Sequence, residues 1–467
     1  MTTTGIYCRD GCPGRPKRRN VIDFTSPVAA EAAGFRACLR CRPDRLPSAY
    51  AVDGAPSVVA RALLVIGEGG LDDDREEEIA RRLSVSSRHL RRLFLQHIGA
   101  TPAFVARSRR AHFVRRLLDE TELSIAQIAF AAGFSSIRQM NRVVRETFRA
   151  TPSALRAKRL RNDRLVADGG LPLRIPYQSP FSFAASLDFL HRRAIPGVEA
   201  VCAGSYRRTI TTCGNPGVID VRDAGDGRHL IVVAHLPTFE ALIDDVARVR
   251  RIFSVDQPAA MWLPQLMGDP LLAPLIAARP GLRPLGAWDR FEVAARIIIG
   301  QGVSVPAAST LAGRLAQALG TPVTGVSEFG LTHVFPPAQR LAGAGLAEIT
   351  GIGVPESRAT AIQALARGYT ASEICLDPSV TLGRLLEQLT ALPGIGPWSA
   401  HFIALRAAGH LDAFPAEDLG LRRAMSRLLG REEETMVSTK ELLERAEQWR
   451  PYRAVAAMHL WASLQAD

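Results

Sequence analysis

Leu392-Pro-Gly-Ile-Gly-Pro-Trp-Ser-Ala400 is the stretch of this 467-residue chain that decides the fold of its C-terminal part. Two glycines two positions apart permit a tight backbone turn between helices, and the N–H groups of such a turn approach a phosphate without side-chain obstruction. A Gly-x-Gly pair alone often marks no more than a helix turn. Further along, Phe414-Pro-Ala-Glu-Asp-Leu-Gly-Leu421 places an acidic pair where a loop meets a helix, a position at which Asp also serves as an N-cap.

The two stretches together resemble the helix-hairpin-helix DNA glycosylases, also called HhH-GPD. The resemblance implies that Asp418 stabilises the positive charge that develops on the sugar as the N-glycosidic bond breaks. It also implies that Gly394 and Gly396 approach the DNA backbone. The target nucleotide must leave the base stack and enter a pocket, because the bond cannot be reached inside a stacked duplex.

Aromatic side chains are expected around this carboxylate, because alkylated purines such as 3-methyladenine are cationic and aromatic faces attract cations. The resemblance places Trp398, Phe402 and Trp461 there, with Phe402 where close relatives carry Tyr; each of the three equally suits a core position. Trp398 also stands where bifunctional glycosylase/lyases carry a Schiff-base lysine, so a monofunctional glycosylase is expected. Only Cys375 lies beyond residue 213, too few cysteines for the four-cysteine iron–sulfur cluster of some relatives.

The resemblance extends upstream to the AlkA-type alkylbase glycosylases. It is carried by Leu173-Arg-Ile-Pro-Tyr-Gln-Ser-Pro-Phe181, by Ala278-Arg-Pro-Gly-Leu-Arg283 and by Ala295-Arg-Ile-Ile-Ile-Gly-Gln-Gly-Val-Ser304. It implies an α/β domain over residues 171–287 before an all-α glycosylase domain over 288–467. That family carries a bulky wedge residue where this chain has Gly302, so another residue must fill the gap left by the flipped base, or base flipping is weaker.

Residues 56–160 are predicted to be almost wholly helical and to contain two helix-turn-helix units. In the first, a helix from Glu76 to Leu83 precedes a turn over residues 84–86 and a basic second helix that carries Arg88. In the second, residues 124–133 end at a glycine suited to a helix C-terminus, and residues 135–148 form the expected recognition helix. The side chains on its polar face that suit base edges and phosphates are Ser136, Arg138, Gln139 and Arg142.

Two basic units in tandem, each followed by Ala-Thr-Pro, resemble the DNA-binding domain of AraC-type regulators. Helical packing without DNA binding is the alternative. The distribution of charge favours a polyanionic partner, because residues 1–165 hold 30 Lys and Arg against 17 Asp and Glu, whereas the other 302 residues hold 28 against 29.

The cysteines are also unevenly placed, with four of seven at Cys8, Cys12, Cys38 and Cys41. Two close pairs bridged by 25 residues suit a tetrahedral zinc site with four thiolate ligands. Four thiolates most often hold a purely structural zinc. Because zinc keeps its ligands as thiolates, a ligand can also act as a nucleophile.

The surrounding sequence, Thr3 to Pro16 and Ala33 to Pro43, resembles the N-terminal domain of the Ada methylation-response proteins. In that family the first cysteine of the quartet accepts a methyl group from methylphosphotriesters in DNA, which by motif position is Cys8. The resemblance also makes Arg15 a phosphate contact. Because the motif follows Met1 closely, the domain over residues 1–50 is expected to be partial, N-terminally truncated.

The sequence thus predicts a multidomain, mainly α-helical protein: the zinc domain (1–50), the helix-turn-helix bundle (56–160), a linker (161–170), the α/β domain and the glycosylase domain. The predicted function is bifunctional: an activator that senses methylated DNA through Cys8 and a monofunctional 3-methyladenine-type DNA glycosylase. Expected partners are zinc, double-stranded DNA and RNA polymerase. No apolar run approaches a membrane span and no signal-peptide core is present, so a cytoplasmic location is expected.

Two other functions are compatible with the same residues. The chain could be a regulator alone, with a degenerate glycosylase lobe that only binds DNA, although an intact Asp418 argues against this. It could instead be a glycosylase whose N-terminal third holds it on DNA without methyl transfer. Repair of O6-methylguanine is not expected, because the chain has no Pro-Cys-His-Arg acceptor motif.

Overall fold

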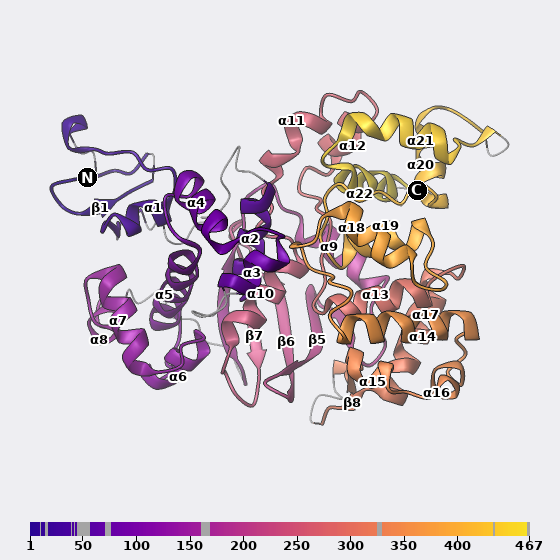
Figure 1. The fold of residues 1–467 in the computed structure, drawn as a ribbon, viewed down its shortest axis with the longest axis horizontal. Coiled ribbons are helices and arrows are strands. Elements are labelled where there is room, and N and C mark those ends of the chain that lie inside the picture. Colours follow the sequence, from indigo (N-terminus) through magenta and orange to yellow (C-terminus); the bar gives the residue numbers. More distant parts are fainter. Residues whose placement is uncertain are drawn as a thin grey trace. The chain divides into compact units, whose positions relative to one another are not determined.

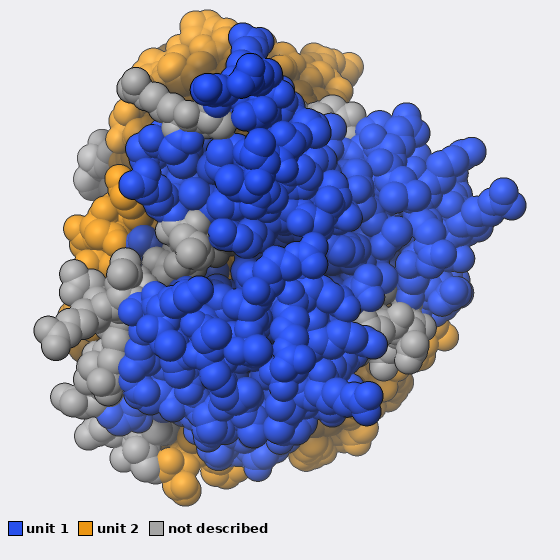
Figure 2. All heavy atoms as spheres, turned by 90° about the vertical axis from the view of Figure 1, so that its left-hand side faces the viewer, with its two compact units in different colours: residues 1–177, 212–217, 229–248 blue, residues 178–211, 218–228, 249–467 orange. Residues whose placement is uncertain are grey.

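The computed structural model describes residues 1–9, 11–14, 17–38, 40–41, 43, 57–70, 76–159, 169–324, 329–432 and 435–464. The chain forms two compact units, coloured separately in Figure 2. Unit 1 comprises residues 1–177, 212–217 and 229–248, and unit 2 comprises residues 178–211, 218–228 and 249–467. Among the described helices, none has the length and apolar character needed to cross a membrane.

Unit 1 begins with a small element built around two short strands. Strand β1 (Ile6–Tyr7) pairs in parallel with β2 (Arg36–Ala37), and helix α1 (Pro27–Ala32) lies between them in the sequence, after the short helix η1 (Arg18–Asn20). Ser26 caps α1 through a hydrogen bond that its side chain accepts from the Ala29 N–H. The core of this element is small, which is typical of domains that need a metal.

The helix-turn-helix part of unit 1 follows the predicted plan. Its helices are α2 (Ser57–Gly67), α3 (Glu76–Arg82), α4 (Ser87–His97), α5 (Pro102–Glu120), α6 (Ile125–Ala131), α7 (Ile137–Phe148) and α8 (Pro152–Arg156). Ser or Thr caps the N-termini of α4 to α8, which explains why each helix starts there. Gly133 takes the left-handed conformation (φ +75°) in the turn between α6 and α7, as a C-terminal glycine does.

The α/β part contains a sheet with strand order β3-β7-β6-β5-β4. Its strands are β3 (Leu171–Pro176), β4 (Glu199–Cys202), β5 (Ser205–Thr212), β6 (Asn215–Asp223) and β7 (His229–His235). Strand β3 pairs antiparallel with β7, and β4 with β5. The associated helices are α9 (Phe183–His191), α10 (Leu242–Ile252), η4 (Ala259–Met261), α11 (Leu263–Leu266) and α12 (Leu272–Ala278).

The part of unit 2 that follows residue 288 is almost entirely helical, and its later helices are the orange to yellow ribbons of Figure 1. Two apolar clusters form its core, one centred on α13 and α17 and the other on α20 and α22. The elements are α13 (Arg290–Ile299), α14 (Val305–Leu319), β8 (Thr321–Pro322), β9 (His333–Val334), α15 (Ala338–Ala342), α16 (Leu346–Thr350), α17 (Glu356–Thr370), α18 (Leu382–Thr390), α19 (Pro397–Arg406), α20 (Leu419–Leu428), α21 (Thr439–Ala446), η7 (Glu447–Trp449) and α22 (Arg453–Ser463). The predicted fold class is confirmed.

Candidate functional sites

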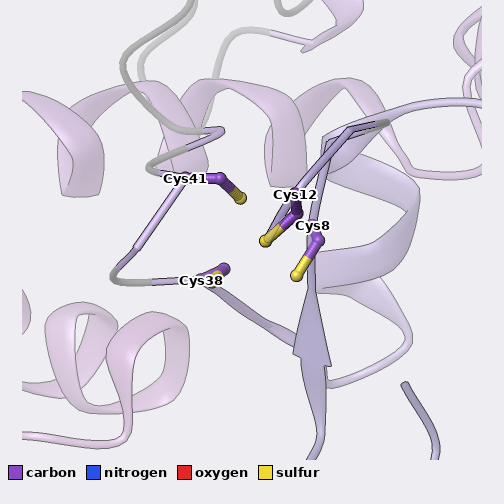
Figure 3. A group of neighbouring side chains, drawn as sticks. All are labelled: Cys8, Cys12, Cys38 and Cys41. Atoms are coloured by element: carbon purple, nitrogen blue, oxygen red, sulfur yellow. The ribbon is translucent and has the colours of Figure 1, made fainter. Parts of the chain in front are cut away.

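The four cysteines of the N-terminal quartet converge in one cluster (Figure 3). Cys8 and Cys38 directly follow the paired strands β1 and β2, and the Cys38 N–H donates to the Tyr7 carbonyl at 3.0 Å. Parallel pairing therefore places these two cysteines side by side. Gly11, at φ +74°, forms the turn that brings Cys12 back toward them. All four Sγ atoms lie within 4.8 Å of one another.

The chemistry of this cluster fits a metal ion with tetrahedral sulfur ligands. Four sulfurs at about 2.3 Å from zinc lie about 3.8 Å apart, compatible with the observed spread. Without a metal, burial and hydrogen bonds with Cys38 and Cys12 raise the pKa of the Cys8 thiol. Burial raises the pKa of Cys38 too, but hydrogen bonds from the backbone N–H groups of Cys41 and Arg40 and from the Cys8 and Cys41 side chains together lower this pKa to about 7. A cation at the centre would offset the repulsion between the four thiolates.

The helix-turn-helix candidates divide between exposed arginines and capping residues. Arg88 on α4, and Arg138 and Arg142 on α7, are exposed, and no hydrogen bond or ion pair ties them to the described part of the chain. Ser136 instead caps α7, because its Oγ accepts from the Gln139 N–H at 3.1 Å. The Gln139 side chain turns back to accept from Ser135. Arg15 lies outside the described residues.

The hairpin of unit 2 has the conformation that its two glycines predict. Gly394, in the turn after α18, has a φ of +75°, and an added Cβ there would lie 3.2 Å from the Ala361 Cβ. Gly396 is the N-cap of α19, with Pro397 at the first helical position. Both glycines are exposed. Pro397 has no N–H group, and the Trp398 N–H donates to the Glu417 carboxylate at 3.2 Å. The exposed backbone of the two glycines still lets a phosphate approach this turn without side-chain obstruction.

Asp418 is the N-cap of α20 and also the centre of a hydrogen-bond network. Its Oδ1 accepts from the Leu421 N–H at 3.0 Å and from the Trp461 indole at 2.8 Å. Its Oδ2 accepts from the Trp398 indole at 3.0 Å. Three donors therefore fix the carboxylate of a residue that remains partly exposed. The same Asp418 side chain thus caps a helix and lies at the centre of the candidate site, so the two functions suggested by the sequence do not exclude each other.

Three aromatic rings from two helices form a row beside Asp418. The Phe402 ring lies between Trp398 and Trp461, with centroids 5.5 Å from each. Trp398 and Phe402 lie on α19, whereas Trp461 lies on α22. All three rings are partly buried and pack against the apolar core centred on α13 and α17. The sequence-predicted candidates are therefore brought together, and each indole contributes both a ring face and a hydrogen bond.

The loop that contains Gly302 is tied to the hairpin. The Gln301 amide donates to the Gly394 carbonyl at 2.9 Å and to the Ser399 Oγ at 2.8 Å. Gly302 has a φ of +64°, a conformation in which a side chain would be strained. The next residue, Val303, is an exposed apolar side chain. The Gln301 contacts were not predicted, because they join residues about a hundred positions apart.

A second group missed by the sequence analysis lies on and after α9. The Arg193 guanidinium stacks over the Phe189 ring at 3.9 Å from its centroid, and the buried Arg406 lies over the same ring at 4.5 Å. Burial and the charges of Arg192 and Arg296 together lower the pKa of Arg193 to about 10, while the charge of Asp418 acts in the opposite direction. Arg193 is therefore close enough to influence the field at Asp418. No motif in the sequence marks these arginines.

Four family models match the chain in the order in which the parts were predicted. They describe the metal binding domain of Ada (residues 1–44), a helix-turn-helix domain (79–158), the AlkA N-terminal domain (172–289) and the HhH-GPD superfamily of base excision DNA repair proteins (295–451). These matches confirm the predicted resemblances. The C-terminal part is a DNA glycosylase domain.

Similar proteins give the same result. A "DNA-3-methyladenine glycosylase 2" of Escherichia coli is 30% identical over 61% of this chain and 95% of its own length. The solved "3-methyladenine dna-glycosylase from Archaeoglobus fulgidus" covers 63% of this chain and 98% of its own, with a TM-score of 0.55 at 24% identity, which supports the fold. The "Probable bifunctional transcriptional activator/DNA repair enzyme AlkA" of Mycobacterium tuberculosis is 39% identical over all of this chain and 92% of its own length. A match of that identity across every part places the chain in the AlkA family of bifunctional transcriptional activator/DNA repair enzymes.

Proposed function

We propose that the chain senses methylphosphotriesters in DNA through Cys8, activates repair genes, and excises alkylated purines as a monofunctional DNA-3-methyladenine glycosylase. One observation carries the enzymatic half: the Asp418 carboxylate is held between two indole N–H groups beside a row of aromatic rings. Zinc is the proposed metal of the cysteine cluster. The four parts named from the sequence are the proposed functional domains.

In the proposed glycosylase reaction, Asp418 faces the sugar of an extruded nucleotide. As the bond between C1′ and the base nitrogen breaks, both electrons leave with the base, and a cationic alkylated purine departs as a neutral base. The fixed carboxylate stabilises the positive charge left on the sugar. Water then forms the new C1′–O bond and releases one proton. Trp398, Phe402 and Trp461 bind the cationic base through their ring faces.

We propose Val303 as the residue that fills the gap left by the flipped base. Gly302 has no side chain, and Gln301 is already engaged with the hairpin. Val303 is the adjacent exposed apolar side chain. The hydrogen bonds of Gln301 fix this loop against the turn whose N–H groups would bind a DNA phosphate. Val303 is therefore suited to enter the base stack when the hairpin engages the backbone.

In the proposed sensing step, the Cys8 sulfur attacks the methyl carbon of a methylphosphotriester. The S–C bond forms as the C–O bond breaks, and the leaving group is an ordinary phosphodiester anion. Bound zinc would keep the four sulfurs as thiolates. The thiolate becomes a neutral thioether, so one negative charge next to the DNA backbone disappears and binding strengthens. Arg15 is the proposed phosphate contact in this step.

The exposed arginines of α4 and α7 are the proposed promoter contacts. Arg88, Arg138 and Arg142 are the stronger candidates, because the side chains of Ser136 and Gln139 already form capping hydrogen bonds. Ser136 and Gln139 remain candidates for base contacts, but DNA would have to replace their capping hydrogen bonds. RNA polymerase is the proposed protein partner of an activator, and the cytoplasm, where a bacterial chromosome lies, is the proposed location.

The deciding experiment measures release of free bases from methylated duplex DNA by the full chain and by Asp418→Asn. Asn also caps helices, so the variant keeps α20 while losing the carboxylate. We expect the wild type to release 3-methyladenine and the variant to be at least about a thousandfold slower, as for loss of a principal electrostatic group. Glu444→Gln, an exposed residue of α21, is the control and should match the wild type. An inert wild type that still binds promoter DNA would instead support a regulator with a degenerate glycosylase lobe.

A further inference from the structure

A buried carboxylate joins the cysteine-bearing element to the helix-turn-helix part within unit 1. Glu31, near the end of α1, has a side chain that is 2% exposed. Its Oε1 accepts from the Tyr7 hydroxyl at 2.7 Å and lies 2.6 Å from the His112 Nε2, and its Oε2 accepts from the Ser108 hydroxyl at 2.6 Å. Three side chains from two elements therefore converge on one carboxylate.

The partners of Glu31 connect two proposed functional surfaces. Tyr7 is the last residue of β1 and directly precedes Cys8. Ser108 and His112 lie one turn apart on α5, and the His112 ring packs edge-on against Phe148, the last residue of α7, at 5.2 Å. A continuous path of contacts thus leads from the proposed methyl acceptor to the proposed recognition helix.

Other contacts hold the same two elements together. The Ser26 hydroxyl donates to the Ile98 carbonyl at 2.8 Å, and Val28 belongs to the apolar core of the first helix-turn-helix unit. Gly99 packs so closely that an added Cβ would lie 2.6 Å from the Ala29 Cβ. The interface is therefore a packed surface, with Glu31 as its buried charged centre.

We infer that Glu31 is a positioning residue that docks the cysteine-bearing element onto α5, so that methylation at Cys8 is read as tighter DNA binding by α7. The docking follows from the contacts alone, whereas its link to methylation rests on the function proposed above. If the cysteine-bearing element is held rigidly on α5, the Cys8 surface and α7 can bind one duplex together. Binding then loses no further conformational entropy in orienting the two parts. A buried carboxylate suits this task, because any arrangement that removes its hydrogen-bond partners leaves a desolvated charge unsatisfied.

The test uses the zinc-loaded full chain and two readouts. The first is amide hydrogen exchange in α1, which reports the dock itself. The second is the ratio of the affinities of the Cys8-methylated and unmethylated protein for one 30-base-pair duplex, with methylation supplied by DNA that carries methylphosphotriesters. A general loss of stability affects both forms alike and leaves this ratio unchanged, whereas a positioning role changes it.

We expect Glu31→Gln to speed exchange in α1 at least tenfold and to bring the affinity ratio close to one. Zinc content and the extent of Cys8 methylation should stay within twofold of the wild type. Asp23→Asn is the control, because Asp23 is an exposed carboxylate of the same element and its loss removes the same charge. This variant should match the wild type in both readouts.

Unchanged exchange in α1 together with an unchanged affinity ratio in Glu31→Gln would overturn the inference. If Glu31→Gln does not fold, the double variant Tyr7→Phe/Ser108→Ala removes two donors and keeps the Glu31–His112 pair. It should show the same two effects in weaker form, and the absence of both would equally refute the dock. If Cys8 is not methylated even in the wild type, the sensing function fails, while exchange in α1 still decides the docking role.

Discussion

The indole N–H of Trp461 donates to the Asp418 carboxylate at 2.8 Å, although the two residues are 43 positions apart and lie on different helices. The Trp398 indole holds the other carboxylate oxygen. The orientation of the carboxylate therefore depends on the aromatic side chains beside it. In the proposed reaction, the same two residues would bind the base and aim the group that stabilises the sugar.

Replacing Trp461 with Phe should separate these two contributions. The variant keeps an aromatic face but removes one donor to Asp418, and a hydrogen bond to a charged group contributes about 1.5–3 kcal/mol. We expect the rate of base release to fall roughly ten- to a hundredfold. Trp449→Phe is the matched control, because its indole donates to Asp269 in the same unit rather than to Asp418. That change should lower stability and leave the rate nearly unchanged; equal rate losses in both variants would contradict a specific role for Trp461.

Replacing Val303 with Ala should weaken excision without changing the fold. The side chain is exposed, so its truncation costs little stability. If it fills the gap in the duplex, base release from duplex DNA should fall several-fold, whereas release from methylated single strands should stay constant. A parallel loss on both substrates would show that Val303 does not act as a wedge.

Removing the metal should abolish sensing and leave base excision intact. Without a cation, the pKa of the Cys8 thiol is raised, so Cys8 is protonated at neutral pH and is a poor nucleophile. All residues of the proposed glycosylase site belong to unit 2, away from the cysteine cluster in the sequence. We expect chelation to release one zinc per chain, to stop methyl transfer and to preserve release of 3-methyladenine. Cys12→Ser should reproduce these effects, and methyl transfer by the metal-free protein would contradict the assignment.

Replacing Arg142 with Gln should weaken promoter binding in a way that identifies the contact. A lost phosphate contact lowers affinity on all sequences and reduces the salt slope by about one, whereas a lost base contact costs about 1–3 kcal/mol on the promoter alone. Titrations at several salt concentrations distinguish the two cases, and Arg138→Gln can be analysed in the same way. Arg222→Gln, an exposed arginine of β6, removes the same charge and should leave binding unchanged.

The stability of unit 2 should fall in mild acid. Burial lowers the pKa of His459 from 6.5 to about 4, so the folded state holds this imidazole neutral. Between these values the unfolded chain binds a proton that the folded chain does not. The free energy of unfolding therefore does not depend on His459 above pH 6.5. As the pH falls from 6.5 toward 4, protonation of His459 in the unfolded chain lowers that free energy by at most about 1.4 kcal/mol per pH unit.

Denaturant titrations followed by tryptophan fluorescence measure this effect, because all five tryptophans lie in unit 2. His459→Gln should flatten the dependence on pH, and the contribution of His401, whose pKa is also lowered to about 4 by burial, should remain. An unchanged slope in His459→Gln would show that His459 is not responsible.

Local sequence determined much of this protein. Ser and Thr caps set the starts of the helix-turn-helix helices. Gly133 marked the turn between α6 and α7, Gly394 marked the hairpin of unit 2, and the spacing of the cysteines predicted a metal cluster. These features depend on backbone preferences and hydrogen bonds over a few residues, so they can be read from neighbouring positions. The Asp418 motif likewise indicated both an N-cap and a candidate site.

Tertiary structure alone decided which distant side chains meet. Trp461 reaches Asp418, Gln301 reaches Gly394, and Glu31 meets Ser108 and His112, 77 and 81 positions away. Such contacts depend on how helices pack, and packing is set by the volumes and shapes of many side chains at once. No short motif contains that information. The sequence therefore pointed to the chemistry of each proposed site. Packing decided how the residues of each site are held, and it also joined the cysteine-bearing element to the helix-turn-helix part.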